Sequence, residues 1–116
     1  MKRVVFLLPL MVLFIGFTAC KKCKKEDPIS RIVNNGTESA SVQIQTSGGN
    51  TVNINNIQPG ETSEDKVFAE GTVTFTISIG NNNPVVLVEE MEQCWEYEIV
   101  VDANNDVVSY PTDRNE

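Results

Sequence analysis

The segment TVTFTISI, residues 72–79, alternates strictly between apolar and hydroxyl-bearing side chains. The apolar set is Val73, Phe75, Ile77 and Ile79, and the polar set is Thr72, Thr74, Thr76 and Ser78. Successive side chains of an extended chain point to opposite faces, so the two sets fall on opposite sides of a strand. The segment therefore predicts a β-strand with one face in the core and the other in water.

Three further segments show the same period of two residues. They are SVQIQT (41–46), TVNINNI (51–57) and WEYEIVV (95–101). Their predicted inward side chains are Val42, Ile44, Val52, Ile54, Trp95, Tyr97, Ile99 and Val101. A fifth segment, PVVLV (84–88), is apolar throughout, and such a run indicates a strand covered on both faces.

Turn-forming residues separate these segments at short intervals. Asn35-Gly36 is typical of a type I′ hairpin, and the other turns are expected at 47–50, 58–61, 70–71, 80–84 and 103–106. Short strands with frequent turns predict an all-β fold, namely one small antiparallel β-sandwich of seven or eight strands, with a small barrel as the alternative. The sandwich is expected over residues 29–112, and a disordered tail over 113–116.

One of these turns carries a family resemblance. The segment NIQPGET (56–62), followed by an alternating strand, is similar to a loop found in immunoglobulin-like and fibronectin-type sandwiches. The resemblance implies an immunoglobulin-like or fibronectin-like arrangement of the predicted sandwich.

The N-terminus has the pattern of a cleaved signal peptide. Lys2 and Arg3 precede an uncharged run, 4–17, which as a helix would reach about 21 Å, short of the roughly 30 Å hydrocarbon core of a bilayer. Small residues follow this run, as they do before a signal cleavage point. Residues 1–19 are therefore expected to be removed and to take no part in the fold.

The residues Thr18-Ala19-Cys20 resemble the lipobox of bacterial lipoproteins, although Phe17 stands where leucine is commonest. The resemblance implies cleavage between Ala19 and Cys20 and lipid on the Cys20 sulfur. Residues 20–28 then predict a flexible tether rich in lysine. An uncleaved anchor helix and an ordinary signal peptide remain the alternatives.

The chain as a whole resembles the small β-sandwich lipoproteins of Bacteroidetes-type bacteria. This resemblance implies display at the cell envelope, in the outer membrane, with the membrane as a partner through the lipid. It implies no catalytic activity.

Charge divides the tether from the predicted domain. From Glu26 onward, three basic residues face sixteen acidic residues, a net charge of −13. A surface this acidic opposes binding to nucleic acid, which depends on lysine and arginine against phosphate. It would also be repelled by anionic lipid, which favours a domain held away from the membrane.

The cysteines other than Cys20 are Cys23 and Cys94. An exported protein folds where disulfides can form, so a bridge between them is left open. The position of Cys23 within the lysine tract favours the other outcome, a free thiol in the tether and a separate, partly buried Cys94.

Catalytic groups are scarce. The chain has no histidine, which removes the usual serine and cysteine triads and the commonest general base. Cys94 lies in the acidic segment EEMEQCWEYE (89–98), which is interpreted as a solvated hairpin rim that would suppress a thiolate. No enzyme activity is expected, and no cofactor apart from the covalent lipid.

One pattern suggests a cation. Asp102, Asn104 and Asp106 have the alternate spacing of calcium loops, with Asp113 at the twelfth position. Val107 stands where such loops need glycine, so an ordinary Asp/Asn hairpin turn is the favoured interpretation.

Two functions follow from this context. The leading hypothesis is a non-enzymatic display or interaction module that binds a protein or glycan through strand edges or through the loops 47–50, 80–84 and 103–106. The alternative is a tethered acidic inhibitor of a cationic hydrolase such as a lysozyme or a protease, steered to its target by opposite charge.

Overall fold

Eight strands make up the regular structure of the part of the chain that the computed structural model describes, residues 23–115. The predicted signal peptide (1–19) and the predicted cleavage and lipid site at Cys20 lie outside the described residues. The strands are β1 (Ile29–Asn34), β2 (Ala40–Gln45), β3 (Thr51–Ile57), β4 (Lys66–Val67), β5 (Gly71–Ile79), β6 (Val85–Met91), β7 (Trp95–Val101) and β8 (Val107–Asp113). Between residues 23 and 115 there is no helix long and apolar enough to cross a membrane.

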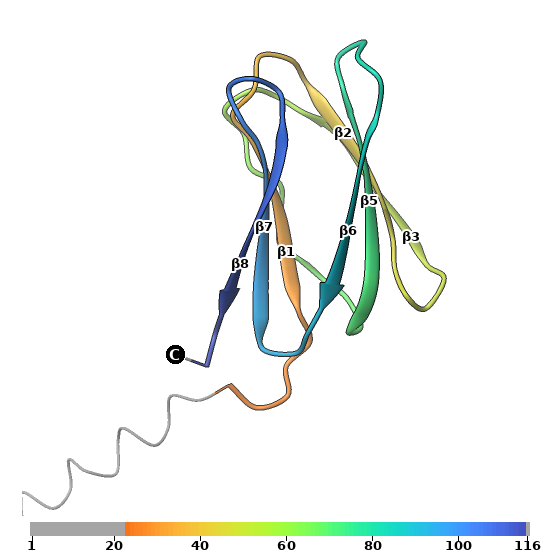
Figure 1. Cartoon of the computed structure of the whole chain (residues 1–116), viewed down its shortest axis with the longest axis vertical. Helices are drawn as coiled ribbons and strands as arrows, with labels where there is room; N and C mark the ends of the chain where they lie inside the picture. The colour runs from red at the N-terminus through yellow and green to blue at the C-terminus, as the bar shows by residue number, and fades with distance from the viewer. Residues whose placement is uncertain (1–22, 116) are drawn as a thin grey trace, which may run out of the picture.

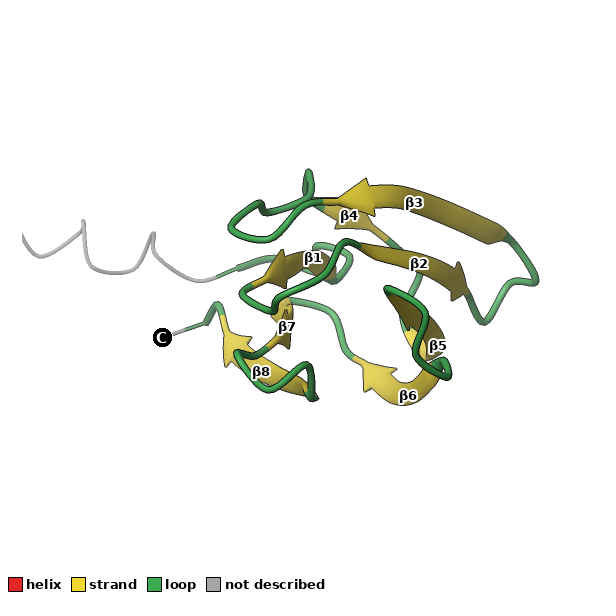
Figure 2. Cartoon of the chain, turned by 90° about the horizontal axis from the view of Figure 1, so that it is seen from above, coloured by secondary structure: helices red, strands yellow, loops and turns green. Residues whose placement is uncertain are grey.

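The strands form two sheets that pack face to face (Figures 1 and 2). Sheet A has the order β4-β1-β7-β8, and sheet B has the order β3-β2-β5-β6. Every pairing is antiparallel except that of β1 with β7, which is parallel. The predicted all-β sandwich is confirmed, although its strands are shared between the sheets differently from those of an immunoglobulin constant domain.

The core lies between the inner faces of the two sheets. All four predicted inward residues of β5 are buried, and Phe75 at the strand's centre has no exposed surface. The inward residues of β2 lie beside them in sheet B, and those of β7 in sheet A face them, as the alternation predicts. The other buried apolar residues include Ile32, Val42, Ile44, Ile57, Tyr97, Ile99 and Val101, while Val52, Ile54 and Trp95 pack at the margin and are only partly buried.

The prediction that segment 84–88 is covered on both faces is wrong. Val86 and Val88 in β6 are 61% and 56% exposed. They lie opposite Thr76 and Thr74 on the outer face of sheet B, whereas Leu87 lies opposite Phe75 on the inner face. Their β-branched side chains suit the extended backbone of an outermost strand without being buried.

Two connections also differ from the sequence-based prediction. Asn35-Gly36 does not close a hairpin, because β1 is in sheet A and β2 is in sheet B. The acidic segment 89–98 is not a hairpin rim for the same reason, since it carries the chain from β6 in sheet B to β7 in sheet A. The expected hairpin turns at 47–50, 80–84 and 103–106 are confirmed by the pairings β2–β3, β5–β6 and β7–β8.

Asn34, at the end of β1, organises the crossover between the sheets. Its side chain is fully buried, and its Nδ2 donates hydrogen bonds to the carbonyl oxygens of Glu38 and Ile57, each at 2.8 Å. Its Oδ1 accepts the backbone N–H of Gly36 at 2.9 Å. One amide therefore fixes the β1–β2 connection against the end of β3.

The change Asn34→Ala is expected to lower the free energy of unfolding by about 2–4 kcal/mol, because two carbonyl groups lose their donor inside the protein. Chemical denaturation measures the loss. Asn82→Ala, in the exposed β5–β6 turn, is the control and should change stability by less than about 0.5 kcal/mol. Equal stability of the two variants would contradict the role given to Asn34.

Candidate functional site

A groove runs along one side of the sandwich, between the edges of the two sheets. Its volume is about 410 Å³, and β3 forms one wall while the loop between β3 and β4 forms the other. Its lining is mainly amide, hydroxyl and carboxylate side chains. The residues are Asn53, Ile54, Asn55, Asn56, Ile57, Glu61, Thr62, Ser63, Glu64 and Lys66.

The loop wall is held in place by β1. The backbone N–H of Ser63 donates to the Ile32 carbonyl at 2.8 Å, and the Ile32 N–H donates to the Ser63 Oγ at 2.9 Å. The backbone of Asn34 also bonds Gly60 and Glu61, so the loop runs along β1 like an irregular edge strand. The groove therefore lies between the free edge of sheet B and the edge of sheet A.

Sheet B has almost no charge, in contrast to the rest of the protein. The run from Ser39 to Gly60 and the run from Gly71 to Val88 contain no charged residue, and together they supply β2, β3, β5 and half of β6. A second, smaller hollow of about 160 Å³ lies on the outer face of this sheet, lined mostly by hydroxyl and amide side chains of β2, β3 and β5. The groove and this face are continuous, because both include Asn53 and Asn55. The β3 side of the groove is uncharged, whereas its other wall carries Glu61, Glu64 and Lys66.

The outer face of sheet A carries a charged cluster instead. Arg31 in β1 forms ion pairs with Asp65 at 2.8 Å and with Glu96 and Glu98 in β7, each at 3.5 Å. The guanidinium hydrogen bond holds the pKa of Asp65 below its ordinary value. The positive charge of Arg31 thus reduces the repulsion between carboxylates that lie close together on this face.

We expect the Asp65–Arg31 pair to contribute to stability only above acidic pH. Because the folded pKa of Asp65 is depressed, this contribution is present above the unfolded pKa, about 3.9, and is lost as the pH falls through the folded value. Nuclear magnetic resonance titration should show the Asp65 carboxyl titrating below about 3.9. Arg31→Met should raise that pKa toward 3.9, and an unchanged midpoint in this variant would contradict the assignment.

Two of the three loops predicted to bind a ligand meet at one end of the sandwich. The β7–β8 turn contacts the β1–β2 connection, since the Asn105 Oδ1 accepts the Thr37 N–H at 3.0 Å and the Asn105 Nδ2 donates to the Thr37 Oγ1 at 2.9 Å. The β5–β6 turn joins them through a bond from the Gly80 N–H to the Ser39 carbonyl. The third loop, 47–50, lies at the other end (Figure 1).

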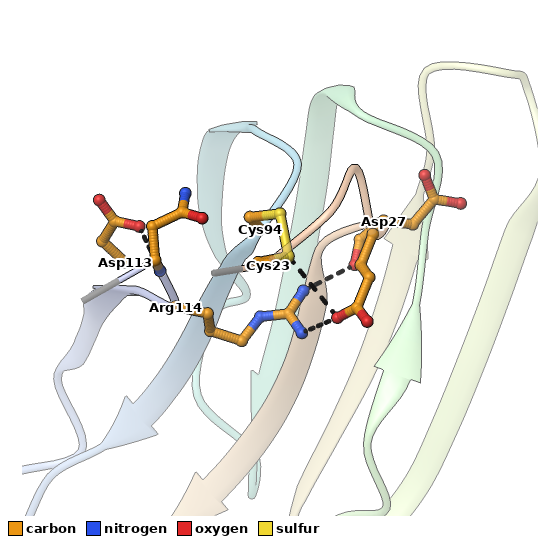
Figure 3. Close-up of a disulfide and its surroundings, with 7 residues drawn as sticks. Cys23, Asp27, Cys94, Asp113 and Arg114 are labelled. Carbon is orange, nitrogen blue, oxygen red and sulfur yellow. Dashed lines mark hydrogen bonds and ion pairs between the residues drawn. A yellow bond between two sulfur atoms is a disulfide. The ribbon is translucent and has the colours of Figure 1, made fainter. Parts of the chain in front are cut away.

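The N-terminal segment is attached to the end opposite the two gathered loops (Figures 1 and 3). Cys23 and Cys94 form a disulfide with a Cα–Cα distance of 5.8 Å. The bridge that the sequence left open is therefore present in this structure, and the favoured alternative of two free thiols is wrong. Sequence pattern alone could not show that the start of the chain returns to the β6–β7 connection.

Hydrogen bonds reinforce this junction. The Cys94 N–H donates to the Glu26 carbonyl at 2.8 Å, and the Arg114 side chain forms an ion pair with Glu26 at 2.8 Å and donates to the Asp27 carbonyl at 3.1 Å (Figure 3). Residues 23–28, expected to belong to the flexible tether, are thus bound to the sandwich. Residue 113, expected in the disordered tail, ends β8 instead.

The proposed calcium ligands lie in the turn between β7 and β8. The Asp102 Oδ1 accepts the backbone N–H groups of Asn104 and Asp106, at 2.9 and 3.0 Å. The carboxylate thus stabilises the turn, as the hairpin interpretation predicts. In the described part of the chain, no three acidic or cysteine side chains are grouped as metal ligands.

Trp95 and Tyr97 lie on the core side of β7, with their ring centroids 6.4 Å apart. The Tyr97 hydroxyl accepts the Glu92 N–H at 2.9 Å and donates to the Glu90 carbonyl at 3.4 Å. This side chain therefore fixes the β6–β7 crossover, like the tyrosine corner of immunoglobulin-type sandwiches. Burial raises its pKa, which keeps the hydroxyl protonated and able to donate.

The sequence did not identify the groove as a site, because β3 and the loop that forms its second wall belong to different sheets. The available signal was the uncharged run around β3, which stands out in so acidic a chain. Comparison with protein-family models, curated proteins and solved structures finds no match for this chain.

Proposed function

We propose that this chain is an envelope lipoprotein, held in the outer membrane by lipid on Cys20, whose β-sandwich is a non-enzymatic interaction module. The observation that supports an interaction module is the groove of about 410 Å³ at the free edge of β3. Most of its polar lining groups are amides and hydroxyls, with Glu61, Glu64 and Lys66 on the loop side. The groove therefore suits a partner of little net charge that is rich in hydrogen-bonding groups. A protein backbone or a neutral glycan has this chemistry.

The junction determines how an anchored domain would be presented. The disulfide and the Arg114 contacts fix the N-terminal segment to one end of the sandwich. The gathered loops would then lie at the membrane-distal end, and the groove would face sideways along the membrane. A binding surface in this position suits a neighbour anchored in the same membrane.

Metabolic labelling with an alkyne-bearing fatty acid tests the lipid anchor. The full-length chain should incorporate the label and fractionate with membranes, and Cys20→Ala should lose both properties. Lys22→Ala, two residues away, is the matched control and should keep them. Label that persists in Cys20→Ala would contradict the proposed lipid site.

A photo-crosslinking residue placed at Asn55 tests the groove in cells. Asn55 lies in the groove lining, whereas Val108 is an exposed residue of β8 in sheet A and serves as the control position. Adducts should form from position 55 and not from position 108. Equal adduct formation from both positions would remove the groove as the binding surface.

A further inference from the structure

β3 differs from the other outermost strands of the sandwich. β8 contains Pro111 and Asp113, β6 carries Glu89 and Glu90 in its second half, and β4 is only two residues long. Charged residues, proline and short length are the features by which sheet edges avoid pairing with other chains. β3 has seven residues with neither proline nor charge, so it is the least protected edge among residues 23–115.

The outward backbone groups of β3 can be assigned from its hairpin. The Thr46 N–H donates to the Asn50 carbonyl at 2.9 Å, and the register places Gln45 opposite Thr51. Antiparallel pairing alternates bonded and non-bonded residues, so Val52 is bonded to β2 while Thr51 and Asn53 direct their N–H and C=O groups away from it. No described strand pairs with this side, which is open in the view of Figure 2.

The inner side of the same edge is incompletely covered. Val52 and Ile54 pack against the core but remain partly exposed, because β3 extends past the short β4 (Figure 2). An added strand would pair with the free backbone and also cover these two side chains. The edge thus offers hydrogen bonds and apolar contact together.

Charge indicates which partner fits. The sixteen acidic residues of the chain lie outside the two neutral runs of sheet B, and only Glu61 and Glu64 among them line the groove beside β3, together with Lys66. A cationic partner would therefore be drawn mainly to other surfaces. Two copies of this chain repel each other wherever acidic surfaces face. That repulsion is weakest at β3, which is itself uncharged and whose neighbouring groove wall sets Lys66 beside Glu61 and Glu64. When a strand pairs with the same strand of a second copy in antiparallel fashion, a two-fold axis relates the two molecules. Each molecule then uses up its own β3 edge, so the assembly stops at a dimer.

We propose that the free edge of β3 is a self-association surface. Two copies pair their β3 strands in antiparallel fashion and join two four-stranded B sheets into one sheet of eight strands. This inference deepens the proposed function by naming a partner for the groove edge. Anchoring in one membrane favours it, since neighbours confined to a surface meet at high effective concentration.

Cysteine cross-linking of the full-length chain in membranes tests the proposal. The variant Asn53→Cys is treated with a short bismaleimide and should give a covalent dimer. The reagent is long enough to join the two cysteines even if the paired β3 strands are shifted along each other by a residue or two. Gln43→Cys is the matched control, since Gln43 is exposed on β2 directly opposite Asn53. In the paired dimer the two Gln43 positions would be three strand spacings apart, roughly 14 Å, and should not link.

Two disruptive changes complete the test in the Asn53→Cys background. Thr51→Pro removes an outward N–H, and Asn55→Lys adds a charge but leaves the backbone unchanged; each should abolish the dimer, whereas Thr51→Ser should keep it. Equal linking at position 43, or a dimer that survives both disruptive changes, would overturn the proposal. The unsubstituted chain is treated alongside, because a dimer formed through Cys20 would count against the lipid site and not against strand pairing.

Discussion

Replacing Cys23 and Cys94 together with serine is expected to lower the free energy of unfolding by about 4 kcal/mol. The disulfide joins residues 71 positions apart, and a cross-link of that span removes much conformational freedom from the unfolded chain. For a domain of this size, a loss of about 4 kcal/mol corresponds to roughly 15–30 °C in melting temperature.

Thermal unfolding followed by circular dichroism measures this effect. A reducing agent should lower the melting temperature of the unsubstituted protein to near that of the double variant. The double variant is its own control, since the same agent should leave its melting temperature unchanged. Cys23→Ser alone should match the double variant, because either substitution breaks the bridge. A double variant within about 2 °C of the unsubstituted protein would contradict the structural role of the bridge.

Phe75→Ala should lower the free energy of unfolding by about 3–5 kcal/mol, the range for removing a large aromatic side chain from a packed core. Phe75 is fully buried at the centre of β5, between β2 and β6 and facing sheet A. The neighbouring side chains belong to strands held in place by their hydrogen bonds to β5, so they cannot collapse fully into the space. Urea denaturation should show a lower midpoint with a similar slope.

Thr74→Ala is the matched control for Phe75→Ala. Thr74 precedes Phe75 in the same strand and faces outward beside Val88. Its replacement should lower the free energy of unfolding by less than about 1 kcal/mol, which is the full range over which residue types differ in their preference for strands. If both variants lose the same stability, the inner and outer faces of β5 have been assigned incorrectly.

The sequence predicted the faces of strands better than their partners. Alternation in β2 and β5 reports which side chains avoid water, and those assignments are confirmed. Alternation does not report which sheet a strand joins. For this reason the sequence predicts hairpins at Asn35-Gly36 and at the acidic segment 89–98, where the chain in fact crosses between the sheets. In β6 the continuous valines indicated burial, but the outer valines are exposed on an edge strand.

The contacts that sequence reasoning missed are long-range polar contacts. Asn34 resembles any turn residue in sequence, and only the folded chain brings its amide to the Glu38 and Ile57 carbonyls. The groove likewise depends on the pairing of β3 with β2 and on the loop's attachment to β1. Such contacts leave no periodic signal, because each joins residues whose spacing in the sequence is arbitrary.

The junction at Cys23 also determines how the domain would carry a mechanical load. Tension arriving along the N-terminal segment reaches β1 through the chain and β7 through the disulfide, at the same end of both strands. Because β1 and β7 are parallel neighbours, this tension draws them in the same direction and does not slide one past the other. In a lipid-anchored domain, the disulfide would therefore spread such a pull over two strands and keep it from stripping β1 out of sheet A.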